Sequence, residues 1–389
     1  MREVCVIGVG MTPFGKFPQR SILDLGREAC LEALRDAQVP AQRIEAAYCG
    51  HARTGRLLNR ECGIGQSVLW ELGISGIPIS SVGNFCASGS TAFRDAWLSV
   101  ASGLYDIVMA LGAEQLTARG VKGKPLTSDG VELLTVMGFS PPTYFAQIAQ
   151  RHMHDFGTTR EQLALVAVKN RKNACGNPRA QYRKAVTVEE VLKAPMIVDP
   201  LTLLSCCPTG DGAAAAILCS REMAARYTAR PITVAAAVLK SGEYQRRREI
   251  TTLDGTVRAS REAYERAGLG PEELDVAEVH DCFTPAEILH YEDLGLCPKG
   301  EGGAFIASGA TQIGGTIPVN PSGGLISKGH PLGATGIAQI AELVWQLRGQ
   351  AGDRQVEGAR VGLAHCAGGF QESLELAEVA SVTVIILKA

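Results

Sequence analysis

Apolar residues recur along this chain in two patterns, short unbroken runs and longer stretches with a helical period. Residues 22–37 have the helical period, with Ser21 as the predicted N-cap and Pro40 beyond the end. Short runs of the kind found in buried strands cover residues 4–9, 44–48, 78–82 and 107–112. Because strands and helices alternate throughout, the pattern predicts an α/β protein.

The predicted elements repeat within the chain. Residues 33–45 resemble residues 263–275, and in both segments a helix ends, a turn follows and a strand begins. Further along, residues 89–92 start a helix as residues 333–336 do in the second copy. Residues 107–113 and 360–366 then each form an apolar strand. Two such similar β-α-β units predict a duplicated architecture.

The segment between the two copies has a different composition. Residues 120–230 are more polar, contain Pro141-Pro142 and match nothing elsewhere in the chain, so we expect an inserted loop domain. Its basic residues predict a solvated face or, alternatively, a landing surface for a phosphorylated ligand. They include Lys169, Arg171, Lys172, Arg179, Arg183 and Lys184. The predicted domains are residues 1–119 (first half), 120–230 (inserted loop domain), 231–250 (end of the first half) and 251–389 (second half).

Composition argues against several classes of protein. The 389 residues carry a formal net charge of −2, which argues against a general nucleic-acid binder. No apolar run is long enough to span a membrane, and the first residues resemble a strand rather than a signal peptide. The twelve cysteines have neither disulfide nor zinc-ligand spacing. We therefore expect reduced thiols, no metal site and a cytoplasmic location.

One cysteine lies where a thiol can act chemically. Cys86 follows a predicted strand and precedes a predicted helix of small residues. The dipole of a helix N-terminus lowers the pKa of a thiol placed there. The same turn directs free backbone N–H groups at a reacting atom, as an oxyanion hole does. We therefore expect Cys86 to have a lowered pKa and to work with a neighbouring base.

Histidines occupy the corresponding loops of the second copy. His280 ends a predicted strand, and His330 lies in a glycine-rich loop that leads into the second long helix. A further loop, after another apolar run, contains His365 and Cys366. Because α/β sheets place their sites where strands end and helices start on one rim, we expect these loops to meet Cys86.

These loops contain four motifs. They are Asn84-Phe85-Cys86-Ala87-Ser88-Gly89, His280-Asp281-Cys282-Phe283, Asn320-Pro321-Ser322-Gly323-Gly324 with Gly329-His330-Pro331, and Cys366-Ala367-Gly368-Gly369. Together they resemble the motifs of the thiolase superfamily, closest to its sterol-carrier-protein-2-like and archaeal-type branch. The likeness runs in order from Val4 to Leu376 and so covers nearly the whole chain. It implies an α/β, five-layered α-β-α-β-α duplicated fold with an inserted loop domain.

The resemblance also implies an activity and roles for these residues. The chain would be an acyl-CoA thiolase (acyl-CoA:CoA C-acyltransferase) that cleaves a 3-oxoacyl-CoA with CoA or condenses in reverse. Cys86 would carry the acyl group as a thioester, and His330 would take its proton. His280 would support the oxyanion site, while the backbone N–H groups of Cys86 and Gly368 would bind the acyl-enzyme oxygen. Coenzyme A would be a substrate, with no other cofactor.

A second thiol would act as acid and base on the carbon that is protonated in cleavage. The resemblance places this thiol at Cys282 in the sterol-carrier-like branch and at Cys366 in other thiolases. This sequence has both, and the choice between them stays open. Further contacts with CoA or the acyl group are expected from Phe85, Met137, Ser205, Cys207 and Gly329.

The acyl group and the partners are less well defined by the sequence. The aromatic residues Phe85, Phe139, Tyr144 and Phe145 line a pocket for a bulky or aromatic acyl group in one interpretation and are ordinary core residues in the other. The resemblance implies a homodimer or tetramer and a small zinc-binding OB-fold partner that helps to seat CoA. Two alternatives stay open, a ketosynthase-like acyltransferase and a thiolase-like aldolase or scaffold subunit of a larger complex.

Overall fold

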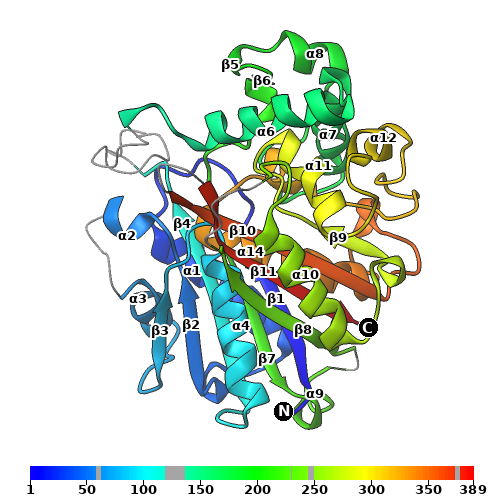
Figure 1. The fold of residues 1–389 in the computed structure, drawn as a ribbon. Helices are drawn as coiled ribbons and strands as arrows, with labels where there is room; N and C mark the ends of the chain where they lie inside the picture. The colour runs from blue at the N-terminus through cyan, green and yellow to red at the C-terminus, as the bar shows by residue number, and fades with distance from the viewer. Residues whose placement is uncertain (58–62, 119–135, 229, 244–248, 373–376) are drawn as a thin grey trace.

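The computed structural model describes residues 1–389 except 58–62, 119–135, 229, 244–248 and 373–376 (Figure 1). Its main element is a nine-stranded sheet in the order β3-β2-β4-β7-β1-β8-β11-β10-β9. The strands are β1 (Val4–Met11), β2 (Ala46–Gly50), β3 (Ile79–Val82), β4 (Ile107–Gln115), β7 (Asp211–Ser220), β8 (Ile232–Ser241), β9 (Val276–Glu278), β10 (Val361–Glu372) and β11 (Ala377–Lys388).

Read outward from the centre of the sheet, the two sides have the same order of strands. Strands β1 and β8 pair antiparallel there, with Val6 opposite Ile232. Outward from this pair, each half continues with its last strand (β7 or β11), then the preceding strand of the sheet (β4 or β10), and then its second strand (β2 or β9). Strand β3 ends the first half, and a parallel bridge between Ala277 and Val319 takes its place in the second. This confirms the predicted duplication.

Helices cover both faces of each half and give five layers. Along β1, the side chain of Ile7 packs toward the outer helices, whereas Val6 packs toward the central ones. Such alternation is expected of a strand that is buried on both faces. The outer layer of the first half is α1 (Ile22–Ala37) and α3 (Ile64–Trp70), the central layer is α4 (Ser88–Ala101) and α14 (Leu332–Leu347), and the outer layer of the second half is α10 (Asp254–Ala267) with α11 (Thr284–Asp293). The predicted five-layered fold is confirmed.

Local signals set the ends of these helices as the sequence predicts. The hydroxyl of Ser21 accepts a hydrogen bond from the backbone N–H of Asp24, and the Asp24 carboxylate accepts one from the N–H of Ser21. This reciprocal cap starts α1 at the predicted residue. At the centre, helices α4 and α14 meet through glycine. A Cβ atom on Gly89 would lie 2.4 Å from the carbonyl oxygen of Gly333, so this approach excludes any larger residue.

The excursion between β4 and β7 forms a separate group of elements, seen at the top of Figure 1. Its elements are α6 (Pro141–Phe156), α7 (Arg160–Cys175), α8 (Val188–Lys193), β5 (Met196–Val198) and β6 (Leu201–Thr202). Strand β7 falls inside the predicted range 120–230, yet it pairs with β4 and β1 in the main sheet. Strand β8, inside the predicted range 231–250, begins the second half of the sheet.

The basic residues of this excursion do not form one solvated face. Lys169 is buried and pairs with Glu287 at 2.8 Å, and the Arg171 guanidinium lies 4.4 Å from the centroid of the Tyr182 ring. The solvated face was therefore a wrong expectation for Lys169 and Arg171, which are both buried. The Glu287 carboxylate compensates the charge of Lys169, whereas Arg171 packs against the Tyr182 ring. The exposed basic residues among those named above are Lys172, Arg183 and Lys184.

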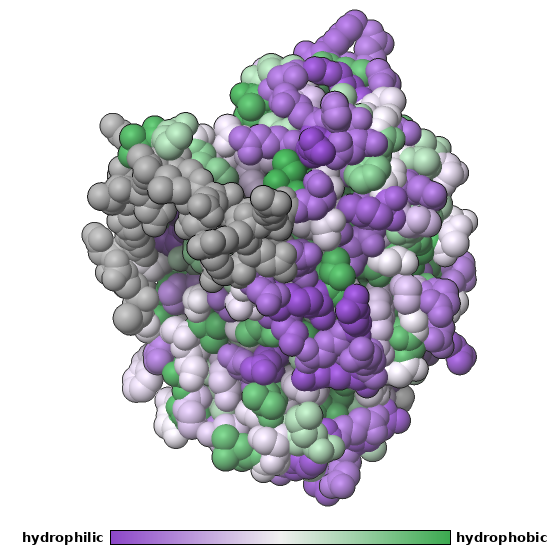
Figure 2. Space-filling model, viewed as in Figure 1, coloured by the Kyte–Doolittle hydropathy of each residue, from purple (hydrophilic) through white to green (hydrophobic). Residues whose placement is uncertain are grey.

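Short helices complete the described part of the chain. They are α2 (Thr54–Leu57), α9 (Arg221–Ala224), α12 (Gly302–Ala307), α13 (Gly324–Ser327) and the 3₁₀ turns Ala41–Arg43, Leu203–Ser205, Pro271–Glu273 and Gly352–Arg354. Within the described ranges, every helix is too short or too polar to cross a membrane. On the face shown in Figure 2, hydrophilic residues predominate and hydrophobic ones form small separate patches.

Candidate active site

A tight turn between β3 and α4 presents Cys86. Phe85 adopts a left-handed backbone conformation with φ of 51°, and the N–H of Ala87 closes the turn on the carbonyl of Asn84 at 3.0 Å. The hydroxyl of Ser88 donates to the Phe85 carbonyl at 2.6 Å and accepts from the Asn84 N–H at 2.8 Å. These bonds fix the backbone on both sides of Cys86, so its side chain projects from a rigid turn.

His330 lies in the loop between α13 and α14, and one hydroxyl sets its protonation. Nδ1 of His330 lies 2.8 Å from Oγ1 of Thr335, whose own proton is donated to the carbonyl of Pro331 at 2.9 Å. Oγ1 must therefore accept from His330, which places the ring proton on Nδ1 and leaves a free lone pair on Nε2. The role of Thr335 was not predicted from the sequence. Its position in the first turn of α14, one helical turn beyond Pro331, was the feature that could have indicated it.

His280 follows β9, and a thiol supports it from the opposite side. Nδ1 of His280 lies 3.5 Å from Sγ of Cys366, and this thiol also donates to the backbone carbonyl of Cys86 at 3.3 Å. Cys366 therefore connects the His280 ring directly to the turn that contains Cys86. The ring centroids of His280 and His330 are 5.1 Å apart, with the planes nearly perpendicular.

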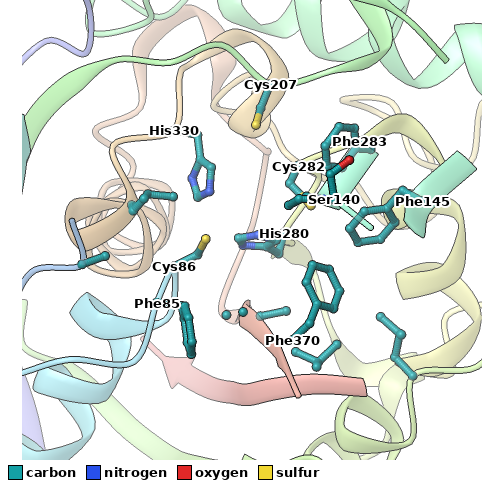
Figure 3. Close-up of a pocket in the computed structure, with 18 of the residues that line it drawn as sticks. Phe85, Cys86, Ser140, Phe145, Cys207, His280, Cys282, Phe283, His330 and Phe370 are labelled. Carbon is teal, nitrogen blue, oxygen red and sulfur yellow. The ribbon is translucent and has the colours of Figure 1, made fainter. Parts of the chain in front are cut away.

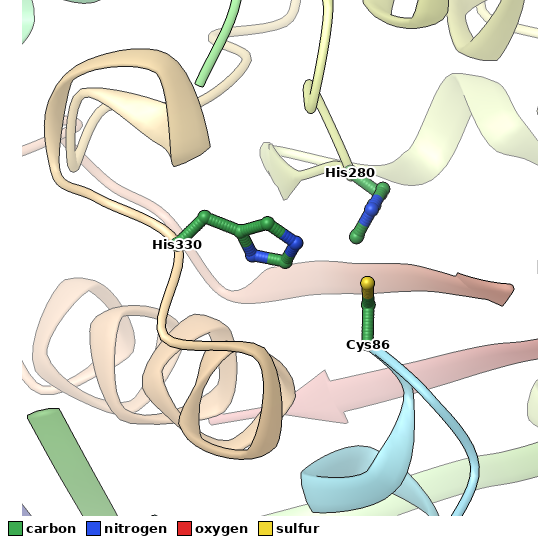
Figure 4. Close-up of side chains that lie close together, drawn as sticks. All are labelled: Cys86, His280 and His330. Atoms are coloured by element: carbon green, nitrogen blue, oxygen red, sulfur yellow. The ribbon is translucent and has the colours of Figure 1, made fainter. Parts of the chain in front are cut away.

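These three side chains converge, as Figure 4 shows. The sulfur of Cys86 and one nitrogen each from His280 and His330 all lie within 4.8 Å of one another. The thiol comes from the first half of the molecule and both imidazoles from the second. The loops predicted to meet do so.

Burial, rather than the helix dipole, dominates the charge state of this group. Burial raises the pKa of the Cys86 thiol to about 12, and the nearby Glu114 carboxylate adds to the shift, while the backbone amide of Gly369 opposes it. The expected lowering of the Cys86 pKa was therefore wrong. Burial also lowers the pKa of His330 to about 3 and that of His280 well below its usual value. The resting site thus contains a neutral thiol beside neutral imidazoles.

This arrangement suits nucleophilic catalysis better than metal binding. Among the described residues, Cys86, His280 and His330 are the one group of metal-ligating side chains with suitable spacing. A metal-bound histidine usually donates its second N–H to a carboxylate, a carbonyl or water. Here the second nitrogens contact a threonine hydroxyl and a cysteine thiol instead. A thiol next to an imidazole with a free Nε2 is the arrangement of a nucleophile and its base.

The three side chains open into a cavity of about 510 Å³, shown in Figure 3. Of the other residues that the sequence placed in the site, Phe85, Cys207, Cys282 and Gly368 also line this cavity. The remaining ones lie outside its described lining: Met137 is 71% exposed, Ser205 and Cys366 are buried, and Gly329 lies against Phe14 and Gln181. Lining residues that sequence reasoning did not single out for the site include Leu253, His290 and Phe370.

Buried ionic contacts hold the two histidine loops together. Glu278, at the end of β9, pairs with Nζ of Lys328 at 3.0 Å, and both side chains are at most 1% exposed. The Glu278 carboxylate also accepts from the hydroxyl of Ser322 at 2.6 Å. Glu278 lies two residues before His280, and Lys328 lies two residues before His330. One ion pair therefore sets the relative position of both imidazoles.

The same motifs match known families and relatives. The model of the thiolase N-terminal domain matches residues 4–222, and that of the thiolase C-terminal domain matches residues 236–378. An acetyl-CoA acetyltransferase of Methanothermobacter thermautotrophicus is 48% identical, over 95% of this chain and 97% of the relative. Sterol carrier protein 2 of Bos taurus is 41% identical, over 94% of this chain and 70% of the relative. A solved structure described as an Ltp2-ChsH2(DUF35) aldolase superposes with a TM-score of 0.85 at 28% identity, covering 100% of this chain and 98% of that one.

The chain therefore belongs to the thiolase family. The relatives confirm the resemblance to the archaeal and sterol-carrier-protein-2 branch. The predicted class of enzyme is confirmed as well, a thiolase-type acyltransferase with coenzyme A as a substrate.

Proposed function

We propose that Cys86 is the nucleophile of this thiolase and that His330 is its base. The observation that carries this proposal is the hydrogen bond from Nδ1 of His330 to Thr335, which leaves the Nε2 lone pair as the acceptor beside the Cys86 thiol. With both groups neutral at rest, proton transfer accompanies attack on the substrate. The pair therefore acts by general-base activation rather than as a standing ion pair.

The reaction of cleavage then follows in two transfers. The Cys86 sulfur attacks the 3-oxo carbonyl, and the bond between C2 and C3 breaks. The electron pair stays with C2, which takes up a proton and leaves as acetyl-CoA, while the remaining acyl group stays on Cys86. The thiol of free CoA then gives up its proton and displaces the acyl group, which restores the Cys86 thiol. Condensation runs through the same steps in reverse.

We assign the second acid and base to Cys282 and a positioning role to Cys366. Both cysteines are buried, but Cys282 lines the cavity, whereas the Cys366 thiol lies outside the described lining and is already engaged with His280 and the Cys86 carbonyl. Burial raises the pKa of both thiols, so each is protonated at rest and able to donate. The backbone N–H groups of Cys86 and Gly368 were the expected oxyanion donors. The backbone amides that contact the thiol are those of Cys86 itself and of Gly369, the residue after Gly368, and we include Gly369 in the proposed oxyanion site.

Assembly with other chains is part of the same proposal. Strand β3 is an edge strand with exposed residues, and Trp70 nearby is 74% exposed, which supports pairing of two copies at this edge. The related aldolase is described together with ChsH2(DUF35), which supports a small zinc-binding OB-fold partner for this chain. The eleven described cysteines are free thiols, which supports a reducing compartment such as the cytoplasm. Light scattering of the chain alone and after coexpression with such a partner tests the assembly.

The aldolase neighbour makes aldol cleavage the second candidate, because its fold covers the whole chain. An aldolase reaction forms no acyl-enzyme and consumes no CoA. The deciding experiment offers the protein 3-oxoacyl-CoA esters with and without free CoA and, separately, 3-hydroxyacyl-CoA esters, which are the substrates of aldol cleavage. CoA-dependent cleavage of the 3-oxo esters that is lost in Cys86→Ser supports thiolysis, whereas cleavage of the 3-hydroxy esters alone, independent of both CoA and Cys86, contradicts it.

The same assay separates the two candidate acid and base thiols. We expect Cys282→Ala to lower kcat by about 10²-fold or more, the usual effect of losing a general acid. Cys366→Ala should retain more activity, because it removes a support of His280 and of the Cys86 turn but leaves the proposed proton donor in place. Near-full activity in both variants would contradict the assigned acid and base chemistry.

A further inference from the structure

The cavity beside Cys86 has two chemically different sides, as Figure 3 shows. One side contains the thiols and imidazoles described above. The other side is formed by four phenylalanine rings from three separate segments. They are Phe139 before α6, Phe145 in α6, Phe283 after Cys282 and Phe370 in β10. None of these four rings takes part in the proposed chemistry. Their position around one cavity therefore indicates a different role, in binding.

The rings hold one another in fixed orientations. Phe145 and Phe283 are stacked with centroids 5.0 Å apart, and Phe370 meets Phe139 edge-on at 5.9 Å. Behind them, Tyr144 contacts Phe370 edge-on at 4.6 Å without lining the cavity itself. Offset-stacked and edge-to-face contacts are the favourable arrangements of aromatic pairs. The wall is therefore a preformed aromatic surface with defined ring positions.

A fifth ring lies next to the nucleophile. Phe85 is 55% exposed and lines the same cavity. Its position depends on Gly369, where a Cβ atom would lie 2.4 Å from the Phe85 ring. In Figure 3, Phe85 and Phe370 flank the part of the cavity near Cys86 and His280, and Phe145 and Phe283 lie farther along it. An acyl group on Cys86 thus meets aromatic rings close to its carbonyl carbon.

The size and polarity of the cavity narrow the acyl group further. An acetyl group is far smaller than 510 Å³ and would leave the aromatic wall without contacts. The described lining includes no carboxylate, so a cationic acyl group would have no counter-charge there. A flexible alkyl chain would gain from its buried area alone, whereas an aromatic ring gains also from quadrupole contacts with the wall.

We infer that this cavity binds an aromatic acyl group, so that the substrates are 3-oxoacyl-CoA esters with an aryl ring near the 3-oxo carbon. The inference rests on the proposed thiolase function and adds the chemical class of its substrate. In cleavage, the arylacyl group is the part that stays on Cys86 when acetyl-CoA leaves. Free CoA then releases it as an arylacyl-CoA.

A matched pair of substrates isolates the aromatic contribution. We would compare 3-oxo-4-phenylbutanoyl-CoA with 3-oxo-4-cyclohexylbutanoyl-CoA, which have similar volume and place one methylene between ring and carbonyl. We expect kcat/KM to be about fivefold higher for the phenyl ester, since stacking adds to equal burial. Acetoacetyl-CoA serves as the reference for the basal reaction. Equal or lower kcat/KM for the phenyl ester, with acetoacetyl-CoA still cleaved, overturns the inference and leaves the thiolase proposal intact.

Variants of the wall test whether these rings cause the preference. In Phe145→Leu and Phe370→Leu, the phenyl-to-cyclohexyl ratio of kcat/KM should fall toward one. Phe305→Leu is the matched control, because Phe305 packs on Tyr291 and does not line the cavity. An unchanged ratio in both wall variants overturns the inference. Failure to cleave any of the three esters, without acylation of Cys86, would instead contradict the proposed function.

Discussion

The two halves of this molecule share one strand order but build different loops at the same place. In the first half, the chain passes from β3 to α4 through a short turn that contains Cys86. In the second half, the path from Val319 to α14 is longer and contains α13 and His330. The short turn holds a nucleophile rigidly, and the long loop brings a base across to it. Duplication thus supplied two equivalent positions, and loop length gave them different chemistry.

The buried carboxylates beneath these loops differ in the same way. Glu114 in β4 accepts hydrogen bonds from backbone N–H groups, among them those of Ala52 and Gly333 at 2.9 Å. Glu278 in β9 instead pairs with the buried ammonium of Lys328. The first carboxylate therefore ties backbone segments of the two halves together, and the second compensates a buried charge within the catalytic loop.

Removal of the base should have the largest effect on activity. We expect His330→Ala to lower kcat/KM by about 10²–10⁴-fold, the usual contribution of a general base. His154→Ala is the control, because this imidazole is 79% exposed and pairs only with Asp155. Steady-state thiolysis measures both variants. A loss below about tenfold for His330→Ala would contradict the claim that the first half supplies the nucleophile and the second half its base.

The two carboxylates should differ when each is made neutral. Glu278→Gln leaves the Lys328 ammonium buried without its counter-charge, which costs about 3–5 kcal/mol of unfolding free energy. Glu114→Gln leaves two backbone N–H donors facing an amide nitrogen, and each should cost about 1–3 kcal/mol. Urea unfolding measures both variants. Replacement of Lys328 by Met in the Glu278→Gln background should recover part of the loss, and no recovery there would contradict the contrast.

The hydroxyl that orients His330 should have a smaller effect. Thr335→Val removes the acceptor for the Nδ1 proton, and we expect kcat to fall by about tenfold, equivalent to one lost buried hydrogen bond. Thr335→Ser should restore most of the activity, because it restores the acceptor. A Thr335→Ser variant as poor as Thr335→Val would show that the methyl group, rather than the hydroxyl, matters.

The charge state of the resting site gives the most specific effect, a change in the pH dependence of one thiol rather than a loss of activity. A Cys86 pKa raised to about 12, beside His330 with a pKa lowered to about 3, means that the thiolate fraction grows as the pH rises from 6 to 9. Alkylation of Cys86 by iodoacetamide should therefore accelerate by about tenfold per pH unit, because the thiolate is the reactive form. Peptide mapping can follow Cys86 and the exposed Cys175 in one sample. A plateau for Cys86 below pH 7 would indicate a standing thiolate–imidazolium pair and contradict the account.

The sequence predicted what depends on local pattern and on recurring motifs. The cap at Ser21, the helix that follows Cys86 and the repeat of residues 33–45 are local signals, and the structure agrees with them. The meeting of Cys86, His280 and His330 followed from strand ends that share a rim.

Predictions that depended on burial were less successful. The helix dipole suggested a lowered pKa for Cys86, but desolvation outweighs it, and desolvation is a property of the packed site rather than of the turn. Lys169 looked like part of a solvated face, because its partner Glu287 is far away in sequence. Phe370 was not singled out for the same reason, since it lies in a different half from Phe85 and lines the same cavity only in the folded molecule.

The central claim, that Cys86 holds the acyl group, can be tested directly. The protein would be mixed with a 3-oxoacyl-CoA in the absence of free CoA, quenched in acid, digested and mapped by mass spectrometry. The account predicts a thioester-linked acyl group on the peptide that contains Cys86, which disappears when CoA is added and is absent in Cys86→Ser. Turnover with no adduct, or with the acyl group on another cysteine, would contradict it.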